Sequence, residues 1–239
     1  METDPLDRDK LMSKDVAVEI RKGFVKKVYG ILTVQLMLTV AVAAPITMAG
    51  PIFVRDHVWM MWGGLGIYIA MSCVAICCRD LLRTFPQNYI ILGTLTLGMS
   101  LVVGCISAMY TWQSVILAAG LTSLIFLGLT VYAWTTKTDF TGFGPYLFCF
   151  AMVLLLFGLT ISILSVCGIK ISWMIIVYDI LGVLLFSCYI VFDTQLMLGE
   201  WGGHKNSFCI DDYCMAALQL YLDIVNLFLL LLELFGDRR

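Results

Sequence analysis

Charged side chains are scarce in this sequence. They make up 13% of its 239 residues, whereas about 25% is typical of a soluble domain. Hydrophobic residues account for 61%, and the mean hydropathy is +0.94. A chain this short cannot bury so much apolar surface within itself, because small domains leave a large fraction of their surface exposed. The lack of charge therefore excludes a soluble globular domain, a disordered chain and a disulfide-stapled secreted module, and it indicates a protein whose solvent is lipid.

Motifs of catalysis and of nucleic-acid binding are also missing. The sequence contains no P-loop, no dinucleotide fingerprint and no Gly-x-Ser-x-Gly elbow. Its last apolar segment has no lysine, which excludes a retinal Schiff base of the opsin type. The formal net charge of −2 gives no electrostatic sign of nucleic acid. We therefore expect no enzyme, no cofactor and no nucleic-acid partner.

Long uncharged runs are what the sequence has instead. Residues 28–54, 84–136 and 140–169 contain no charged side chain. About 20 apolar residues cross a bilayer core of ~30 Å, and in lipid such a segment must be a helix to satisfy its backbone. The pattern predicts an all-α, polytopic membrane protein with six clear spans and a seventh that carries two acids. These spans are residues 28–50, 58–78, 88–109, 114–134, 144–167, 172–198 and 213–235. We expect Pro45 to kink the first span.

The distribution of basic residues predicts the orientation. Residues 1–27 form a polar segment with seven bases and no early apolar stretch, so we expect no cleaved signal peptide. With the N-terminus in the cytosol, 11 of the 15 basic residues fall on the cytosolic side. The division is thus a cytosolic N-terminal segment, 1–27, and a membrane domain, 28–239. The C-terminus stays open, because Arg238 and Arg239 would reach the cytosol if the last segment were re-entrant.

Cysteines and histidines give weaker signals. Most of the nine cysteines fall within spans, where a thiol usually serves as a small packing residue. Cys77 and Cys78, at the predicted cytosolic end of the second span, form a candidate palmitoylation site. His57 and His204 lie in predicted loops. A loop histidine near a membrane can sense pH, but an idle surface position is the simpler interpretation.

Acidic residues within the membrane are the informative ones, since a charged side chain at the bilayer centre costs at least ~2.5 kcal/mol and marks function more often than structure alone. In the last span, polar residues recur at spacings of four, three, four and three around one apolar position, Leu230. This spacing places them on one stripe of a helix, which belongs at the centre of a bundle. The polar members of the stripe are Gln219, Asp223, Asn226 and Glu233.

Asp193, near the end of the sixth span, is the predicted partner of Asp223. The two spans are joined by a short connection, so they can be antiparallel neighbours with these residues at similar depth. Two carboxylates in contact at low dielectric do not both ionise, and their oxygens suit a hard cation. We interpret the pair as a proton-sensitive gate or Ca²⁺ site; a buried structural pair is the alternative. Asp179 is 14 residues earlier, about 21 Å along the same face, and either marks the far mouth of this polar path or sits at the membrane interface.

Several segments carry a family resemblance. Residues 216–228, AALQLYLDIVNLF, resemble the C-terminal signature of the Bax inhibitor-1 family, also called transmembrane BAX inhibitor motif-containing. Residues 192–199, FDTQLMLG, are similar to the sixth helix of its Lifeguard branch, and residues 24–36, FVKKVYGILTVQL, to the start of its first helix. Residues 129–132 and 137–140 also match that branch. The resemblance covers the chain from residue 20 onward.

The resemblance implies a seven-helix bundle with the last helix at its centre. In this family an aspartate pair on helices six and seven is taken to control a pH-sensitive Ca²⁺ leak, and the motif match assigns that role to Asp193 and Asp223, which would bind Ca²⁺ transiently. The family also has an arginine at the cytosolic end of helix two that latches onto the pair. Arg79 is the nearest match here, with Arg83 as the second candidate.

Family members lie in the endoplasmic reticulum, Golgi or other membranes and suppress cell death in eukaryotes. The resemblance thus implies an intracellular membrane, with Ca²⁺, protons and membrane proteins of the cell-death machinery as partners. Asp179 and Glu233 depart from the family, whose members usually have uncharged residues there. A six-helix topology with a re-entrant last segment has been suggested for some relatives. Arg238 and Arg239 can therefore lie on either side of the membrane.

Three functions compete on these residues. The first is a Ca²⁺-permeable leak channel gated by protonation, which lowers store calcium and suppresses cell death. The second is a non-conducting membrane regulator that inhibits apoptosis by binding partner proteins. The third is an intramembrane aspartyl protease. Tyr178 and Asp179 resemble half of the presenilin pair, but the Gly-x-Gly-Asp half is absent, so the first two are favoured.

Overall fold

Seven long helices make up almost the whole molecule. The computed structural model describes residues 5–169 and 171–239, and it describes their side chains except those of residues 5–14 and 79. The helices are α1 (Pro5–Asp56), α2 (Val58–Cys77), α3 (Gln87–Ser107), α4 (Trp112–Thr135), α5 (Gly144–Val166), α6 (Ser172–Leu198) and α7 (Tyr213–Phe235). All seven are long and apolar enough to cross a membrane. The predicted all-α, multi-pass architecture is confirmed, and from α2 onward the predicted ends lie within two residues of the observed ones.

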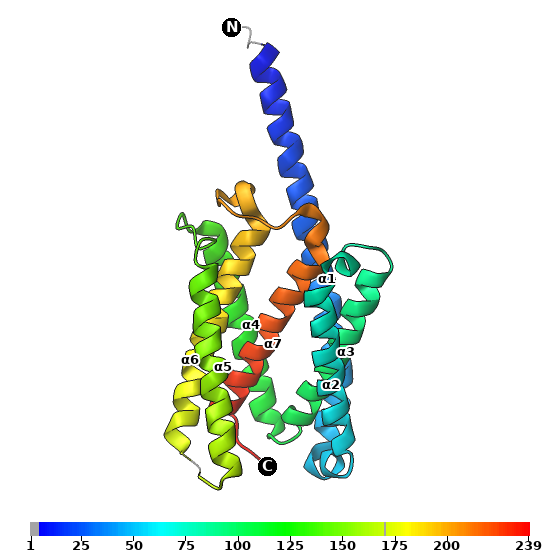
Figure 1. Cartoon of the computed structure of the whole chain (residues 1–239), viewed down its shortest axis with the longest axis vertical. Helices are drawn as coiled ribbons and strands as arrows, with labels where there is room; N and C mark the ends of the chain where they lie inside the picture. Colours follow the sequence, from blue (N-terminus) through cyan, green and yellow to red (C-terminus); the bar gives the residue numbers. More distant parts are fainter. Residues whose placement is uncertain (1–4, 170) are drawn as a thin grey trace.

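Helix α1 differs most from its prediction, because it begins at Pro5 and passes through residues 27 and 28 without a break. The polar N-terminal segment is therefore the first half of a long helix, and Figure 1 shows this half projecting beyond the bundle. Its backbone leaves helical geometry at Gly50, where φ is 83°, and not at Pro45. The reason is local: Pro51 disfavours helical geometry in the residue before it, and glycine adopts a positive φ without strain.

Helix α7 lies at the centre of the bundle, as the resemblance implied. It packs against α1, α3, α4 and α6, and in Figure 1 it crosses between the group of α1, α2 and α3 and the group of α4, α5 and α6. Twelve of its 23 residues are buried, whereas Leu154 is the one buried residue of α5. Helix α5 packs chiefly on α6, so its other faces are left for lipid.

The two chain ends lie at opposite ends of the bundle (Figure 1). Helix α7 is one uninterrupted helix from Tyr213 to Phe235, which favours a last segment that spans the membrane over the re-entrant alternative. After α7, the backbone N–H of Thr111 donates to the Asp237 carbonyl at 2.9 Å, and that of Arg239 donates to the Met109 carbonyl at 2.9 Å. We call the end of the bundle with the α2–α3, α4–α5 and α6–α7 connections the N-terminal end, and the other the C-terminal end.

Candidate functional site: a buried aspartate pair between α6 and α7

Asp193 and Asp223 meet inside the bundle. Their exposed fractions are 5% and 6%, and their carboxyl groups lie within hydrogen-bonding range of each other. Among the described residues, Oδ2 of Asp223 has no hydrogen-bond partner. Two acids that touch in an apolar interior hold a proton between them or bind a cation, because neither charge has water to screen it. The structure thus brings together the two residues that the sequence singled out.

A glycine lets α6 and α7 approach each other about three turns from Asp193, toward the C-terminal end of the bundle. Gly182 is buried on α6, and a Cβ atom there would lie 2.8 Å from Cδ1 of Leu230. Leu230 is the apolar member of the predicted stripe, between Asp223 and the C-terminal end of α7. The Leu230 side chain therefore fills the space that glycine leaves, and it closes the α6–α7 interface below the aspartate pair.

The other acids of the predicted polar path gather at the C-terminal end. Asp179 is 1% exposed and its Oδ1 has no hydrogen-bond partner within the described part of the chain. It lies within electrostatic range of Glu233 and Arg238, which pair at 3.4 Å between Oε1 and Nη2. A cavity of about 730 Å³ between α5 and α6 reaches Glu233 and Arg238. Asp179 and Glu233 thus form a second acidic position on the same two helices.

The two uncharged members of the stripe behave differently from the acids. Asn226 is half-buried, and its Nδ2 donates to the Leu222 carbonyl of its own helix at 2.8 Å. The Oε1 atom of Gln219 is buried and makes no hydrogen bond to any described residue. Both residues lie on α7 with Asp223, as the predicted stripe requires. At the N-terminal end of that stripe, the side-chain oxygen of Gln219 accepts no hydrogen bond from a described residue.

Of the two candidate latch residues, Arg83 has its side chain described, and it binds an acid outside the pair. Arg83 is exposed and binds Asp212 in two places, from Nε to Oδ1 at 2.6 Å and from Nη2 to Oδ2 at 3.0 Å. The hydrogen bonds to Asp212 raise the pKa of the Arg83 guanidinium. Asp212 precedes α7, so Arg83 holds the start of that helix. The side chain of Arg79 lies outside the described residues.

The structure has a second buried polar cluster around α7, which was not predicted from the sequence. The hydroxyl groups of Tyr221 and Thr39 lie 2.8 Å apart, and Ser100 donates to Thr39 at 3.2 Å. Gln35 donates to Thr96 at 3.0 Å. These bonds join α7 to α1 and α3. Hydroxyl groups carry no charge, so a search for charged residues within the spans does not find them. Gln35, a polar residue inside an uncharged span, was the one sequence feature that could have indicated this cluster.

Cysteine and metal-ligand positions add no second site. The nine cysteines, all within the described part of the chain, carry free thiols, and Cys77 and Cys78 are exposed at the end of α2. Palmitoylation there stays a prediction. The described residues contain no group of three or more His, Cys, Asp or Glu side chains that could hold a metal. A cation at Asp193 and Asp223 would thus take at most two protein carboxylates.

Known proteins are similar in sequence to this chain over most of its length. The family model described as "Inhibitor of apoptosis-promoting Bax1" matches residues 21–239. Protein lifeguard 3 of Homo sapiens is 34% identical over 222 residues, which cover 92% of this chain and 70% of that protein. Protein lifeguard 3 of Mus musculus is also 34% identical over 222 residues, with 92% and 71% covered. Protein LIFEGUARD 4 of Arabidopsis thaliana is 36% identical over 222 residues, with 91% and 85% covered. With a match that spans all seven membrane helices, the chain belongs to the Bax inhibitor-1 family.

Proposed function

We propose that the protein is a pH-sensitive Ca²⁺ leak channel of an intracellular membrane, the endoplasmic reticulum or Golgi, which lowers store calcium and so suppresses cell death. The observation that carries the proposal is the buried contact between Asp193 on α6 and Asp223 on α7. Family membership supports the link to cell death. The excess of bases at the N-terminal end supports a cytosolic N-terminus.

The proton that the pair shares is the proposed gate. When both carboxylates ionise, two unit charges about 4 Å apart repel by about 4 kcal/mol at an effective dielectric constant of 20. A divalent cation that replaces the proton removes this repulsion, so Ca²⁺ and protons compete for the pair. We therefore expect the leak to rise with pH. The path would continue past Leu230 toward Asp179 and Glu233, with Gln219 and Asn226 along its wall.

The latch is part of this proposal. Because Arg83 is held by Asp212, Arg79 is the position that we assign to the family's latch. A guanidinium that reaches the pair from the end of α2 would replace the shared proton as the counter-charge and keep the path closed.

Flux from purified protein tests the proposal. Liposomes that contain the protein should release Ca²⁺ faster as the pH rises. Asp223→Asn and Asp193→Asn should each change this pH dependence, because the remaining carboxylate has no like charge beside it. Asp211→Asn is the matched control, since this acid is exposed and precedes α7. Unchanged flux and pH dependence in both pair variants would eliminate the gate.

A non-conducting regulator is the second candidate, and the projecting half of α1 favours it. Val16 and Ile20 are 58% and 51% exposed on this half, and the start of α1 projects beyond the bundle in Figure 1. Exposed apolar groups on a projecting helix can bind a partner protein. This function predicts no Ca²⁺ flux from purified protein, while expression in cells still protects them from death stimuli. A variant with Val16→Ser and Ile20→Ser would then lose protection, whereas the leak channel would keep it.

A further inference from the structure

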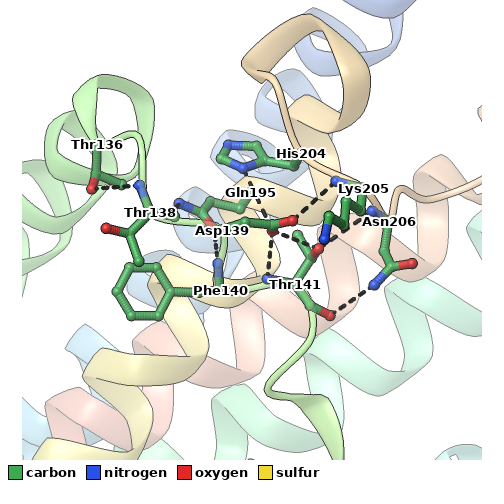
Figure 2. Close-up of polar contacts among 9 residues, drawn as sticks. All are labelled: Thr136, Thr138, Asp139, Phe140, Thr141, Gln195, His204, Lys205 and Asn206. Atoms are coloured by element: carbon green, nitrogen blue, oxygen red, sulfur yellow. Dashed lines mark hydrogen bonds and ion pairs between the residues drawn. The ribbon is translucent and has the colours of Figure 1, made fainter.

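A buried histidine closes the N-terminal end of the bundle beside α6. His204 is 4% exposed, so its interpretation as an idle surface residue is wrong. Its Nδ1 lies 3.7 Å from Oδ1 of Asp139, on the α4–α5 connection (Figure 2). Among the described residues, neither ring nitrogen of His204 has a hydrogen-bond partner. The imidazole ring is thus enclosed beside a carboxylate, and neither of its nitrogen atoms makes a hydrogen bond that would stabilise an added proton.

Asp139 is fixed in place by its own hydrogen bonds. It accepts from the hydroxyl group of Thr141 at 2.7 Å, from the Thr141 backbone N–H at 3.0 Å and from the Lys205 backbone N–H at 3.2 Å. The Thr141 hydroxyl, above all, lowers the pKa of the Asp139 carboxyl. Asp139 is therefore ionised at every pH at which a histidine titrates, and it does not change state when His204 does.

Hydrogen bonds around these two residues join three parts of the chain into one clasp. Asn206 donates from Nδ2 to the Thr141 carbonyl at 3.1 Å. Gln195, fully buried on α6, donates to the Thr138 carbonyl at 2.9 Å and accepts from the Phe140 backbone N–H at 2.7 Å. We define the clasp as residues 138–141, Gln195 and residues 204–206, all of which Figure 2 shows. Gln195 is two residues from Asp193, so the clasp anchors the end of the helix that carries the acid.

Burial dominates the proton affinity of His204. It lowers the pKa of the imidazole below its usual 6.5, and the charge of Asp139 opposes this shift without cancelling it. Among the charged groups that the structure describes, Asp139 is the one that acts on the ring in this way. Glu200 on η2 (Gly199–Gly202) and Lys205 belong to the same connection, and Arg21 of α1 packs against Gly199, whose carbonyl accepts from the His204 backbone N–H. Because the folded clasp favours the neutral ring, its stability is complete above the unfolded pKa and is lost as the pH falls below that value.

From this geometry we infer that His204 is a proton-operated release for the clasp, separate from the aspartate pair. A proton on the ring would bury a charge whose counter-charge, Asp139, lies at ion-pair distance, 3.7 Å, but beyond hydrogen-bonding range, so the carboxylate offsets the cost of burial only in part. Acid in the compartment that faces the N-terminal end therefore frees the α4–α5 connection from the segment after α6. The release also removes both hydrogen bonds of the Gln195 amide, so the end of α6 next to Asp193 loosens.

Hydrogen exchange of the full-length protein in lipid nanodiscs tests this release. After correction for intrinsic rates, peptides that cover residues 137–143 and 203–208 should exchange several-fold faster at about pH 5.5 than at about pH 7.5, the range in which histidine titrates. His204→Gln should remove this pH dependence. His57→Gln, at the other histidine of the chain, should keep it. Equal or slower exchange of the wild-type peptides at the lower pH would overturn the inference, as would loss of the effect in His57→Gln.

A second measurement covers the case in which His204→Gln does not fold. With ¹³C-labelled histidine, the wild-type protein has two imidazole signals, and His57→Gln identifies that of His204. A titration midpoint below that of free histidine supports the release, whereas a midpoint above it means that protonation tightens the clasp and refutes it. The aspartate pair can fail its own flux test without changing this result, because neither experiment here reads Ca²⁺ flux.

Discussion

Arg21 binds α1 to the segment that follows α6, and its removal should weaken this end of the bundle. The side chain is 7% exposed. Its Nη1 donates to the Phe208 carbonyl at 2.7 Å and its Nε to the Leu198 carbonyl at 3.3 Å. Leu198 is the last residue of α6, whose final carbonyls have no partner within the helix. The guanidinium thus acts as a C-terminal cap supplied by another helix.

The size of the effect follows from these two bonds. A hydrogen bond to a charged group contributes about 1.5–3 kcal/mol, so two would contribute about 3–6 kcal/mol if they were additive. Arg21→Met keeps most of the apolar stem and removes the cost of burying a charge, so we expect a net loss of about 2–4 kcal/mol. For a chain of 150–250 residues, each kcal/mol corresponds to roughly 2–4 °C in Tm. The midpoint should therefore fall by about 5–15 °C.

Thermal unfolding in detergent, with hydrogen exchange of residues 196–208, measures this loss. Arg21→Lys should lie between Arg21→Met and wild type, since an ammonium group cannot reproduce the geometry of the guanidinium. Lys26→Met is the matched control, one turn away on the exposed side of α1, and it should leave both readouts unchanged. If Arg21→Met kept its midpoint within about 1 °C of wild type and its exchange pattern, the capping argument would be refuted.

Two further predictions concern the faces of α7. Tyr221→Phe removes the hydroxyl group that binds Thr39 at 2.8 Å and should cost about 1 kcal/mol in a thermal-unfolding assay; equal stability would show that the hydrogen-bond cluster contributes nothing. Gly182→Val places atoms where Leu230 packs and should cost about 1–3 kcal/mol by overpacking. In a double-mutant cycle, Leu230→Ala should restore part of this loss, and strictly additive effects would contradict the contact.

Predictions that depended on hydropathy and charge were accurate. Each of the seven spans was found from the sequence, because the need for an apolar helix about 20 residues long is a property of the segment alone. The stripe that contains Asp223 was found for the same reason, since helical spacing fixes which residues share a face. The break in helical geometry at Gly50 was not predicted, because it depends on Pro51 following a glycine. The helix also runs on through the predicted boundary at residue 27, because a polar sequence can continue a helix outside lipid.

The sequence by itself indicated that the solvent of this protein is lipid, how many helices it has, and that Asp193 and Asp223 can meet at similar depth. Only the tertiary structure decided which other groups meet: Arg21 with the end of α6, and His204 with Asp139. These contacts join residues 177 and 65 positions apart. They depend on how each helix is rotated and shifted against its neighbours. The sequence of a helix that is apolar on nearly every face does not indicate which face turns toward a given neighbour. The rotation is instead determined by close packing of side chains, as at Gly182 and Leu230.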